Sequence, residues 1–326
     1  MFKKIIIGKF NIIFISIITV LLLSACGEAN SSTEEDYPTK NVDFDVGFDA
    51  GSQSDTSART ITKYGEEHFD RSFDITNSPG SAGLTSYENI YDAEADGYNL
   101  MLGTATLITH DLLGDLAFDY DELTPIITFQ TDPLVMFAAE DAPFDDAEEL
   151  VDYAKDHPGD VSVATGAPGG LGNVLAEVFE ERLDVDFKIV PYEGSGAEPV
   201  AQTAGGNAQV SVGGTSEGIS HVKEGDVKVL GTTTDISEVI EDAPTFEELE
   251  LDLGMVGNIR SVYGPPEMPE EIVDKLYDSF KEGTEEEGFD EYIEENGVTK
   301  EVLDGEETKE LYKEQEEVME PVLGEE

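Results

Sequence analysis

Short β-rich runs alternate with helical segments from Tyr37 onward, and this alternation constrains the fold more than any other feature of the sequence. Parallel strands need a crossover connection, which is usually a helix, so the alternation predicts an α/β fold. We expect mostly parallel sheets flanked by helices, with helices at 146–158 and 172–183. The predicted strands begin at Val42, Ser72, Tyr98, Asp160, Phe187, Ala208 and Val227.

The chain is expected to divide into two lobes, because it crosses between two groups of elements near residues 138–144 and returns near 257–266. The first lobe then comprises residues 37–138 and 259–326, and the second comprises residues 139–258. Two crossings imply a hinge, and a hinge between lobes implies a cleft, where small molecules commonly bind.

The charge is extreme: 73 Asp and Glu against 18 Lys and Arg give a net charge of −55. This composition excludes nucleic acid as a partner, because proteins hold phosphates through basic side chains. Apolar segments still recur along the whole body, so a packed core is expected and the acids belong to the surface. At 1 M salt the electrostatic screening length falls to about 3 Å, so that the negative charges repel one another much less. We therefore hypothesise a salt-loving host.

Residues 1–25 have the pattern of a signal peptide, with a basic start and an apolar run over 12–23. The sole cysteine, Cys26, directly follows Leu-Ser-Ala, and this order resembles the lipobox of bacterial lipoproteins. We predict lipidation of Cys26, a polar tether over 26–36, and a location outside the cell membrane, anchored to its outer face. An uncleaved membrane anchor and a buried core thiol are the alternatives. A single cysteine allows no internal disulfide.

Loops rich in Gly, Ser and Thr follow the predicted strands. Glycine lets backbone N–H groups face a ligand, hydroxyls add donors, and each following helix directs its positive end to the same edge. Such loops suit a carboxylate at the carboxyl edge of the strands. Arg260, on the return crossing, is a candidate to bind that carboxylate through two hydrogen bonds, with a structural ion pair as the alternative. The loops are residues 48–59, 77–83, 103–106, 165–173, 191–198 and 213–216.

Two motifs suggest other chemistry but are incomplete. Residues 214–218 match the G-x-S-x-G nucleophile elbow, yet the only histidine after Ser216 is His221, with no acid and histidine further along. Residues 92–103 begin like a calcium loop but have Gly103 where a bidentate Glu is required. Phosphate-loop, dinucleotide and zinc motifs are absent from the sequence, so we expect neither a cofactor nor a metal.

Several segments together resemble the extracytoplasmic solute-binding subunits of tripartite tricarboxylate transporters, the TctC or Bug family. The resemblance runs from about Tyr37 to Leu323. The chain departs from the usual family pattern at Ser52, Gln53 and Ser54, where glycine is more common, and at Ile259, which replaces a common tryptophan. The segments that carry the resemblance are YPTK, AGSQSDTSAR, NSPGSAG, DGYNL, TGAPGGLGN, VPYEGSGAE and IRSVYGPPEMPEE, in that order.

The resemblance implies a two-lobed periplasmic-binding-protein-like fold that closes on a small organic acid, a di- or tricarboxylate. It implies a monomer that is not an enzyme and that delivers its ligand to the permease subunits of a membrane transporter. Asp55 is assigned to ordering its loop or to holding water or a ligand hydroxyl. The implied ligand contacts are Ser52, Ser54, Asp55, Thr56 and Thr104 in the first lobe, Gly169, Gly170, Asn173, Ser195 and Thr215 in the second, and Arg260 at the crossing.

Two other functions remain open on the sequence alone. A secreted esterase would use Ser216 as its nucleophile, although the missing downstream histidine argues against it. A sensory protein would bind the same carboxylate and present it to a receptor.

Overall fold

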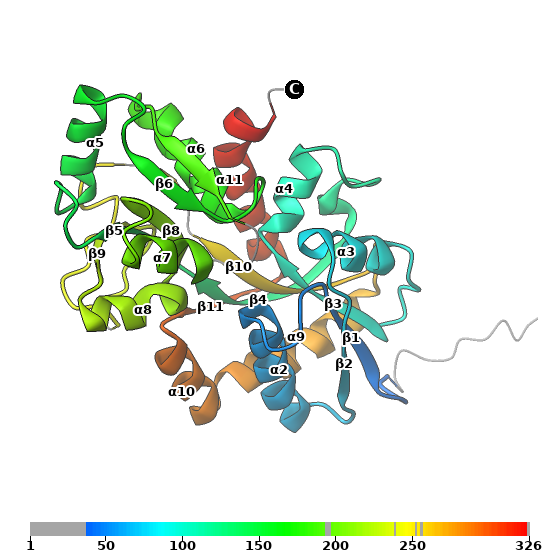
Figure 1. Cartoon of the computed structure of the whole chain (residues 1–326). Coiled ribbons are helices and arrows are strands. Elements are labelled where there is room, and N and C mark those ends of the chain that lie inside the picture. The colour runs from blue at the N-terminus through cyan, green and yellow to red at the C-terminus, as the bar shows by residue number, and fades with distance from the viewer. Residues whose placement is uncertain (1–36, 193–196, 238, 252, 255–256, 325–326) are drawn as a thin grey trace, which may run out of the picture. The chain divides into compact units, whose positions relative to one another are not determined.

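Two β-sheets flanked by helices form the body of the protein in a computed structural model (Figure 1). The structure describes residues 37–192, 197–237, 239–251, 253–254 and 257–324. The predicted leader, the tether, Cys26 and Ser195 lie outside these residues. Residues 40–326 make one unit by their contacts, while the described residues 37–39 belong to a separate N-terminal unit.

The first sheet has six strands in the order β11-β4-β10-β3-β1-β2. Strand β1 is parallel to β2 and β3, whereas β10 runs antiparallel to β3 and β4, and β11 runs antiparallel to β4. The strands are β1 (Val42–Val46), β2 (Phe73–Asn77), β3 (Asn99–Thr104), β4 (Thr124–Asp132), β10 (Asn258–Gly264) and β11 (Thr299–Leu303).

The second sheet has five strands in the order β7-β6-β8-β5-β9. Strand β6 is parallel to β7 and β8, and β5 runs antiparallel to β8 and β9. The strands are β5 (Leu134–Ala139), β6 (Ser162–Thr165), β7 (Lys188–Pro191), β8 (Val210–Gly214) and β9 (Val227–Thr232).

Both sheets are mixed, where the sequence predicted mostly parallel ones. Each of the seven predicted strand segments contains a strand, but β4, β5, β10 and β11 were not predicted. These four strands account for the antiparallel pairing: β10 pairs with β3 and β4, β11 pairs with β4, and β5 pairs with β8 and β9. Pro133 joins β4 to β5 with no helix between them. Because proline has no N–H for a ladder, the first sheet stops there and the chain passes directly to the second.

Helices cover both sheets. In α9 the buried residues Ile272, Leu276 and Phe280 recur every four positions and form one apolar face. Helix α2 lies against α9, where Ser279 donates a hydrogen bond of 2.9 Å to the carbonyl of Gly65. The helices are α2 (Gln53–Gly65), α3 (Leu84–Tyr91), α4 (Thr106–Leu112), α5 (Ala147–Asp156), α6 (Leu171–Leu183), α7 (Ala197–Ala204), α8 (Thr215–Glu224), α9 (Glu270–Thr284), α10 (Glu287–Asn296) and α11 (Gly305–Leu323), with short 3-10 turns at Glu66–His68, Ser81–Gly83 and Tyr120–Glu122.

The two crossings between the sheets lie beside each other. The outgoing crossing is Pro133, and the return crossing enters β10 from Gly257. Gly257 has a φ of +114°, and a Cβ there would clash with the carbonyl oxygen of Asp132 and lie 3.1 Å from the N of Leu134. Only glycine fits this close approach. The lobe limits at 138/139 and 258/259 stay a prediction, while the change of sheet itself occurs at Pro133.

Among the helices that the structure describes, none combines the length and the apolar character that crossing a membrane requires.

Candidate functional site

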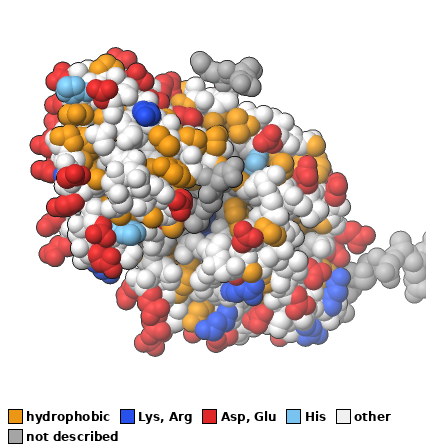
Figure 2. Space-filling model, viewed as in Figure 1, with side chains coloured by type: hydrophobic (Ala, Val, Ile, Leu, Met, Phe, Trp, Pro, Cys, Tyr) orange, Lys and Arg blue, Asp and Glu red, His pale blue; other side chains and the backbone are white. Residues whose placement is uncertain are grey.

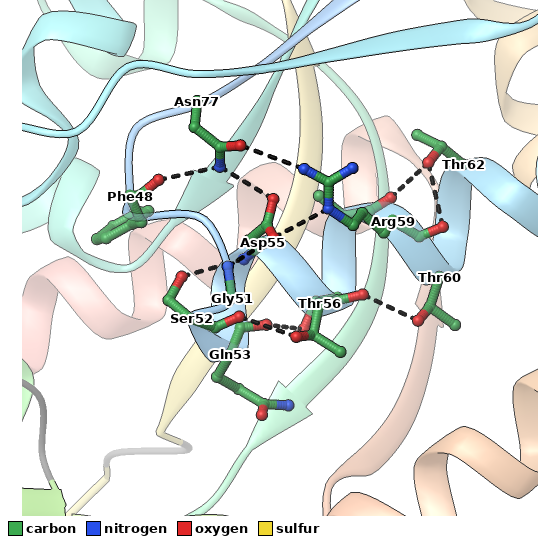
Figure 3. A network of polar contacts seen from close by, with 12 residues as sticks. Phe48, Gly51, Ser52, Gln53, Asp55, Thr56, Arg59, Thr60, Thr62 and Asn77 are labelled. Carbon is green, nitrogen blue, oxygen red and sulfur yellow. Dashed lines mark hydrogen bonds and ion pairs between the residues drawn. The ribbon is translucent and has the colours of Figure 1, made fainter.

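The loop between β1 and α2 is held by Asp55, the third residue of α2 (Figure 3). Its Oδ2 accepts hydrogen bonds from the N–H of Gly51 at 2.8 Å and from Nε of Arg59 at 2.9 Å, and its Oδ1 accepts one from Nδ2 of Asn77 at 2.9 Å. Ser52 caps the helix by accepting from the N–H of Asp55. Both carboxylate oxygens of Asp55 therefore act within the protein.

The electrostatics of Asp55 agree with this role. Burial by itself raises the pKa of the carboxyl, but the hydrogen bonds from Arg59, Gly51 and Asn77 more than offset it and leave the pKa below its ordinary value. The carboxylate therefore stays ionised and fixes the loop. Ser54 is buried beside it, and the hydroxyl of Thr56 donates to the carbonyl of Ser52 at 3.0 Å. Of the roles considered for Asp55, ordering the loop is the one that these contacts support.

Thr104 ends β3 with a buried hydroxyl. It lies 3.0 Å from the hydroxyl of Tyr87 and 2.8 Å from that of Thr106, and Tyr87 lies 2.9 Å from Thr106. In the sheet register Thr104 is the direct partner of Arg260 on β10. Directly paired residues point to the same face of a sheet, so this hydroxyl cluster and the guanidinium share one face.

Arg260 is buried, with 4% of its surface exposed. Its one hydrogen bond among the described residues runs from Nη1 to the carbonyl of Ile259 at 3.3 Å, and its Nε has no partner there. Arg59, Lys228, Lys300 and Lys309 each form an ion pair with an acidic side chain, whereas Arg260 forms none with the described residues. A buried guanidinium with no carboxylate in direct contact is costly, which supports a ligand contact, although the nearby Asp132 also acts on it electrostatically.

Gln130 lies opposite Arg260 on β4 and is fully buried. Its Oε1 accepts a hydrogen bond of 3.2 Å from the hydroxyl of Tyr292 on α10, which itself contacts Gln53 and Ser57 on α2. Burial raises the pKa of Tyr292, so the hydroxyl stays protonated and able to donate. With Oε1 occupied, Nε2 of Gln130 is left without a partner among the described residues.

Asp132, the last residue of β4, is 3% exposed. Its carboxylate packs against Gly214 at the end of β8, where a Cβ would lie 2.9 Å from Oδ2, and its Oδ1 has no hydrogen-bond partner in the described part of the chain. Burial raises the pKa of Asp132 to about 7; nearby Arg260 works against this rise and Glu217 adds to it. Asp132 therefore links the first sheet to the N-terminus of α8.

The loop before α6, at one end of the second sheet, forms hydrogen bonds within itself. The N–H of Gly169 donates to Oδ1 of the buried Asn173 at 3.2 Å, and Gly170 caps α6. Gly169 faces the first sheet's elements, since a Cβ there would lie 3.2 Å from Cδ1 of Leu113 after α4. Thr215 is buried, and its N–H donates to the carbonyl of Pro133 at 3.2 Å.

The structure places the described candidate residues in four groups. Ser52, Ser54, Asp55 and Thr56 share the start of α2; Thr104 and Arg260 are neighbours across β3 and β10; Thr215 adjoins the crossing at Pro133. Gly169, Gly170 and Asn173 form a separate loop at the start of α6. Ser195 lies outside the described residues.

Sequence reasoning missed Gln130, Asp132 and Tyr292. The first two had a signal: an amide and a carboxylate two positions apart in the otherwise apolar and hydroxyl-bearing segment Pro125–Pro133. Fully buried Gln and Asp are uncommon and usually have a partner or a function. Tyr292 had no local signal, because an acidic helix surrounds it.

Most of the acidic side chains of the described residues lie on the surface. Figure 2 shows them mostly around the edge of the face drawn, with largely uncharged side chains toward its middle. A pocket of about 420 Å³ lies between residues 235–237 and 239, which follow the second sheet, and residues 290–300 of α10 and β11. None of the predicted site residues lines this pocket.

The histidine needed for an esterase lies elsewhere. His221 is near the end of α8, with its Nδ1 3.5 Å from Asp226. His221, Glu224 and Asp226 have ligand atoms within 4.8 Å of one another on the surface, a grouping that exposed acids commonly form without a metal. Ser216 occupies the first turn of the same helix.

Comparison with known proteins identifies relatives of the whole body. The family model described as "Tripartite tricarboxylate transporter family receptor" matches residues 58–325. A UPF0065 protein of Bordetella pertussis is 25% identical over 286 residues, which cover 86% of this chain and 87% of the relative.

Solved structures show the same fold. A TctC solute-binding protein from Polaromonas without ligand has a TM-score of 0.79 at 21% identity, covering 89% of this chain and 100% of that one. MatC from Rhodopseudomonas palustris with bound malate has a TM-score of 0.71 at 22% identity, covering 88% and 100%. Another R. palustris protein with adipate has a TM-score of 0.74 at 23% identity, covering 89% and 99%. The predicted two-lobed periplasmic-binding-protein-like α/β fold is confirmed, with mixed sheets.

Proposed function

Because the chain belongs to the tripartite tricarboxylate transporter receptor family, we propose that it captures a small di- or tricarboxylate outside the cell and delivers it to the permease subunits of such a transporter. The family consists of solute-binding receptors, so this chain is a solute-binding protein and not an enzyme. Malate and adipate, bound by the two R. palustris relatives, are small dicarboxylates of the proposed class.

The observation that carries the proposal is the buried guanidinium of Arg260, which has no carboxylate partner among the described residues. A carboxylate ligand supplies the missing charge and accepts from Nε and the terminal amino groups together. Thr104 lies beside Arg260, and the start of α2 joins the same region through Tyr292 and Gln130. The N-terminus of α2 also favours an anion.

Capture requires no chemical step. A ligand that contacts residues from both sheets binds more tightly when the two sheets are close together. It therefore shifts the population toward a closed form. The permease then distinguishes the closed form from the open one. Contacts from Arg260 on one side and from Thr215 and the loop at Gly169 and Gly170 on the other provide this preference for closure.

The ligand class is tested by thermal unfolding of the mature chain with and without a panel of acids at millimolar concentration. The panel comprises citrate, malate, succinate, adipate and aspartate, with matched amides as uncharged controls. We expect at least one acid to raise the midpoint by several degrees and its amide to leave it unchanged, since a ligand at 100 times its Kd adds about 2.7 kcal/mol of stability. No stabilisation by any small carboxylate contradicts the proposal.

Two further features belong to the same proposal. Cys26 carries a lipid anchor that keeps the protein at the outer face of the membrane, as its place after Leu-Ser-Ala suggests. The acidic surface adapts the protein to concentrated salt, where a charge of −55 repels itself far less. Metabolic labelling with a palmitate analogue tests the first feature, with Cys26→Ser as the unlabelled control.

The salt proposal predicts a large change in stability. Screening extends over about 10 Å at 0.1 M salt and about 3 Å at 1 M. We expect the thermal midpoint to rise steeply between 0.1 M and 2 M KCl, and to rise as much in NaCl, because the effect is screening and not specific binding. A midpoint that is equal at both concentrations contradicts adaptation to salt.

A further inference from the structure

Three buried polar atoms on β4 and β10 have no hydrogen-bond partner in the described part of the chain. They are Nε of Arg260, Nε2 of Gln130 and Oδ1 of Asp132. Their residues are 4%, 0% and 3% exposed, so water does not readily satisfy them. Buried polar groups are usually paired, so three unpartnered polar atoms on two adjacent strands point to a ligand.

The strand register places all three on one face of the sheet. Gln130 pairs with Arg260, and Asp132 pairs with Asn258. Paired residues share a face, and so do residues two positions apart along a strand. Strands β4 and β10 lie side by side in Figure 1. Two donors and one acceptor therefore lie on the same face of the sheet.

Contacts within the protein position the side chains of Gln130 and Asp132. The hydroxyl of Tyr292 donates to Oε1 of Gln130, which leaves the buried Nε2 of the amide as the unpartnered donor among the described residues. The carboxylate of Asp132 rests on Gly214, where a Cβ would lie 2.9 Å from Oδ2 and 3.1 Å from Oδ1 and would therefore displace it. Asp132 and Arg260 form no ion pair with each other, and Oδ1 of Asp132 and Nε of Arg260 both remain without a hydrogen-bond partner in the described part of the chain.

We propose that Asp132 makes the site specific for carboxylates that carry a hydrogen-bond donor, a hydroxyl or an ammonium group, next to the acid. The ligand's carboxylate accepts from Arg260 and Gln130, and its donor group gives a hydrogen bond to Oδ1 of Asp132. An acid without a donor leaves this carboxylate unpaired and brings a second negative charge toward it. This inference rests on the proposed function and names the ligand class within it.

The selectivity follows from the cost of an unpaired buried acceptor. A site built to form a hydrogen bond rejects an analogue that lacks the group far more strongly than an apolar pocket rejects a change in size. The guanidinium of Arg260 alone would bind any small dicarboxylate. Asp132 adds the discrimination, at the junction where the first sheet meets α8.

Three acids with the same four-carbon skeleton test the inference: malate carries a hydroxyl, aspartate an ammonium, and succinate neither. Titration calorimetry at pH 8, above the pKa of Asp132, gives each Kd. We expect malate, aspartate or both to bind the mature protein at least about tenfold more tightly than succinate. Comparison of the malate and aspartate affinities shows whether the site prefers a hydroxyl or an ammonium donor.

Two variants assign the discrimination to Asp132. Asp132→Asn removes the charge and keeps the shape, and Gly214→Ala keeps the carboxylate but displaces it. In both we expect the ratio of affinities to fall to within about threefold. Asp152→Asn, which removes one charge from the exposed face of α5, should retain the full ratio. Circular dichroism confirms that each variant is folded.

The outcomes separate this inference from the proposed function. If the protein binds succinate as tightly as malate and aspartate, or if Asp132→Asn retains the tenfold ratio, the inference is wrong while carboxylate binding stands. If only acids of another length bind, the same comparison is made with and without a hydroxyl at that length, and preference for the unsubstituted acid overturns it. If no carboxylate binds, both proposals fail.

Discussion

Replacing Arg260 with alanine is expected to weaken binding of the carboxylate ligand by roughly 2–5 kcal/mol, or about 30-fold to 5000-fold in Kd. The guanidinium is 4% exposed, and no carboxylate of the described residues pairs with it. The ligand therefore supplies its counter-charge in a region shielded from water, where such a pair is strong. Titration calorimetry with the best acid of the panel measures the loss.

Two further variants isolate the role of the fork-shaped guanidinium. Arg260→Lys keeps the charge but loses the two-pronged geometry, and it should bind with intermediate affinity. Arg71→Ala removes an exposed arginine and should bind like the unmodified protein. An Arg260→Ala protein that is folded and binds with unchanged affinity removes Arg260 from the site.

Replacing Asp132 with asparagine is expected to make the unliganded protein more stable at alkaline pH. Burial raises the pKa of Asp132 to about 7, so ionising it in the folded state is unfavourable. The folded-state pKa lies above the unfolded one; the folded protein therefore holds the proton between the two values and loses stability as the pH rises through this window. One pKa unit corresponds to about 1.4 kcal/mol.

The expected signature is a difference that grows with pH. The reference is pH 5, where Asp132 of the folded parent protein is protonated. Between pH 5 and pH 8, the free energy of unfolding of the variant should rise by about 2–3 kcal/mol relative to that of the parent protein. Urea denaturation at constant high salt measures it. Asp111 titrates in the same range, because burial and the nearby Asp119 and Glu316 raise its pKa to about 6. The contribution of Asp111 is the same in both proteins and cancels when their free energies of unfolding are subtracted. If that difference does not change with pH, the pKa of Asp132 is not raised as stated.

The sequence predicted those parts of the fold that have local signals. Strands such as β1 and β6 alternate with helices whose apolar periodicity and capping residues are visible in the chain itself. Strands β4 and β5 were missed, because a direct link through Pro133 has no helix to mark it. The antiparallel position of β10 depends on pairing with segments far away in sequence, which no local pattern encodes.

The candidate site divides in the same way. The sequence left two roles for Asp55, ordering its loop or holding water or a ligand hydroxyl, and the contacts of its carboxylate support the first. Arg260 was noticeable because the chain has few arginines. Gln130 and Tyr292 were missed, because their meeting depends on the register of β4 against β10 and on the packing of α10. Such convergence of distant segments is a property of the folded chain alone.

The adjacency of Pro133 and Gly257 has a mechanical consequence. Both backbone connections between the sheets pass through one small region, so rotation there reorients the entire second sheet with few changes in dihedral angle. Asp132 is the residue immediately before this pivot. We expect a ligand that engages this carboxylate to bias the angle between the two sheets, and by thermodynamic reciprocity a substitution that biases this angle should also alter affinity.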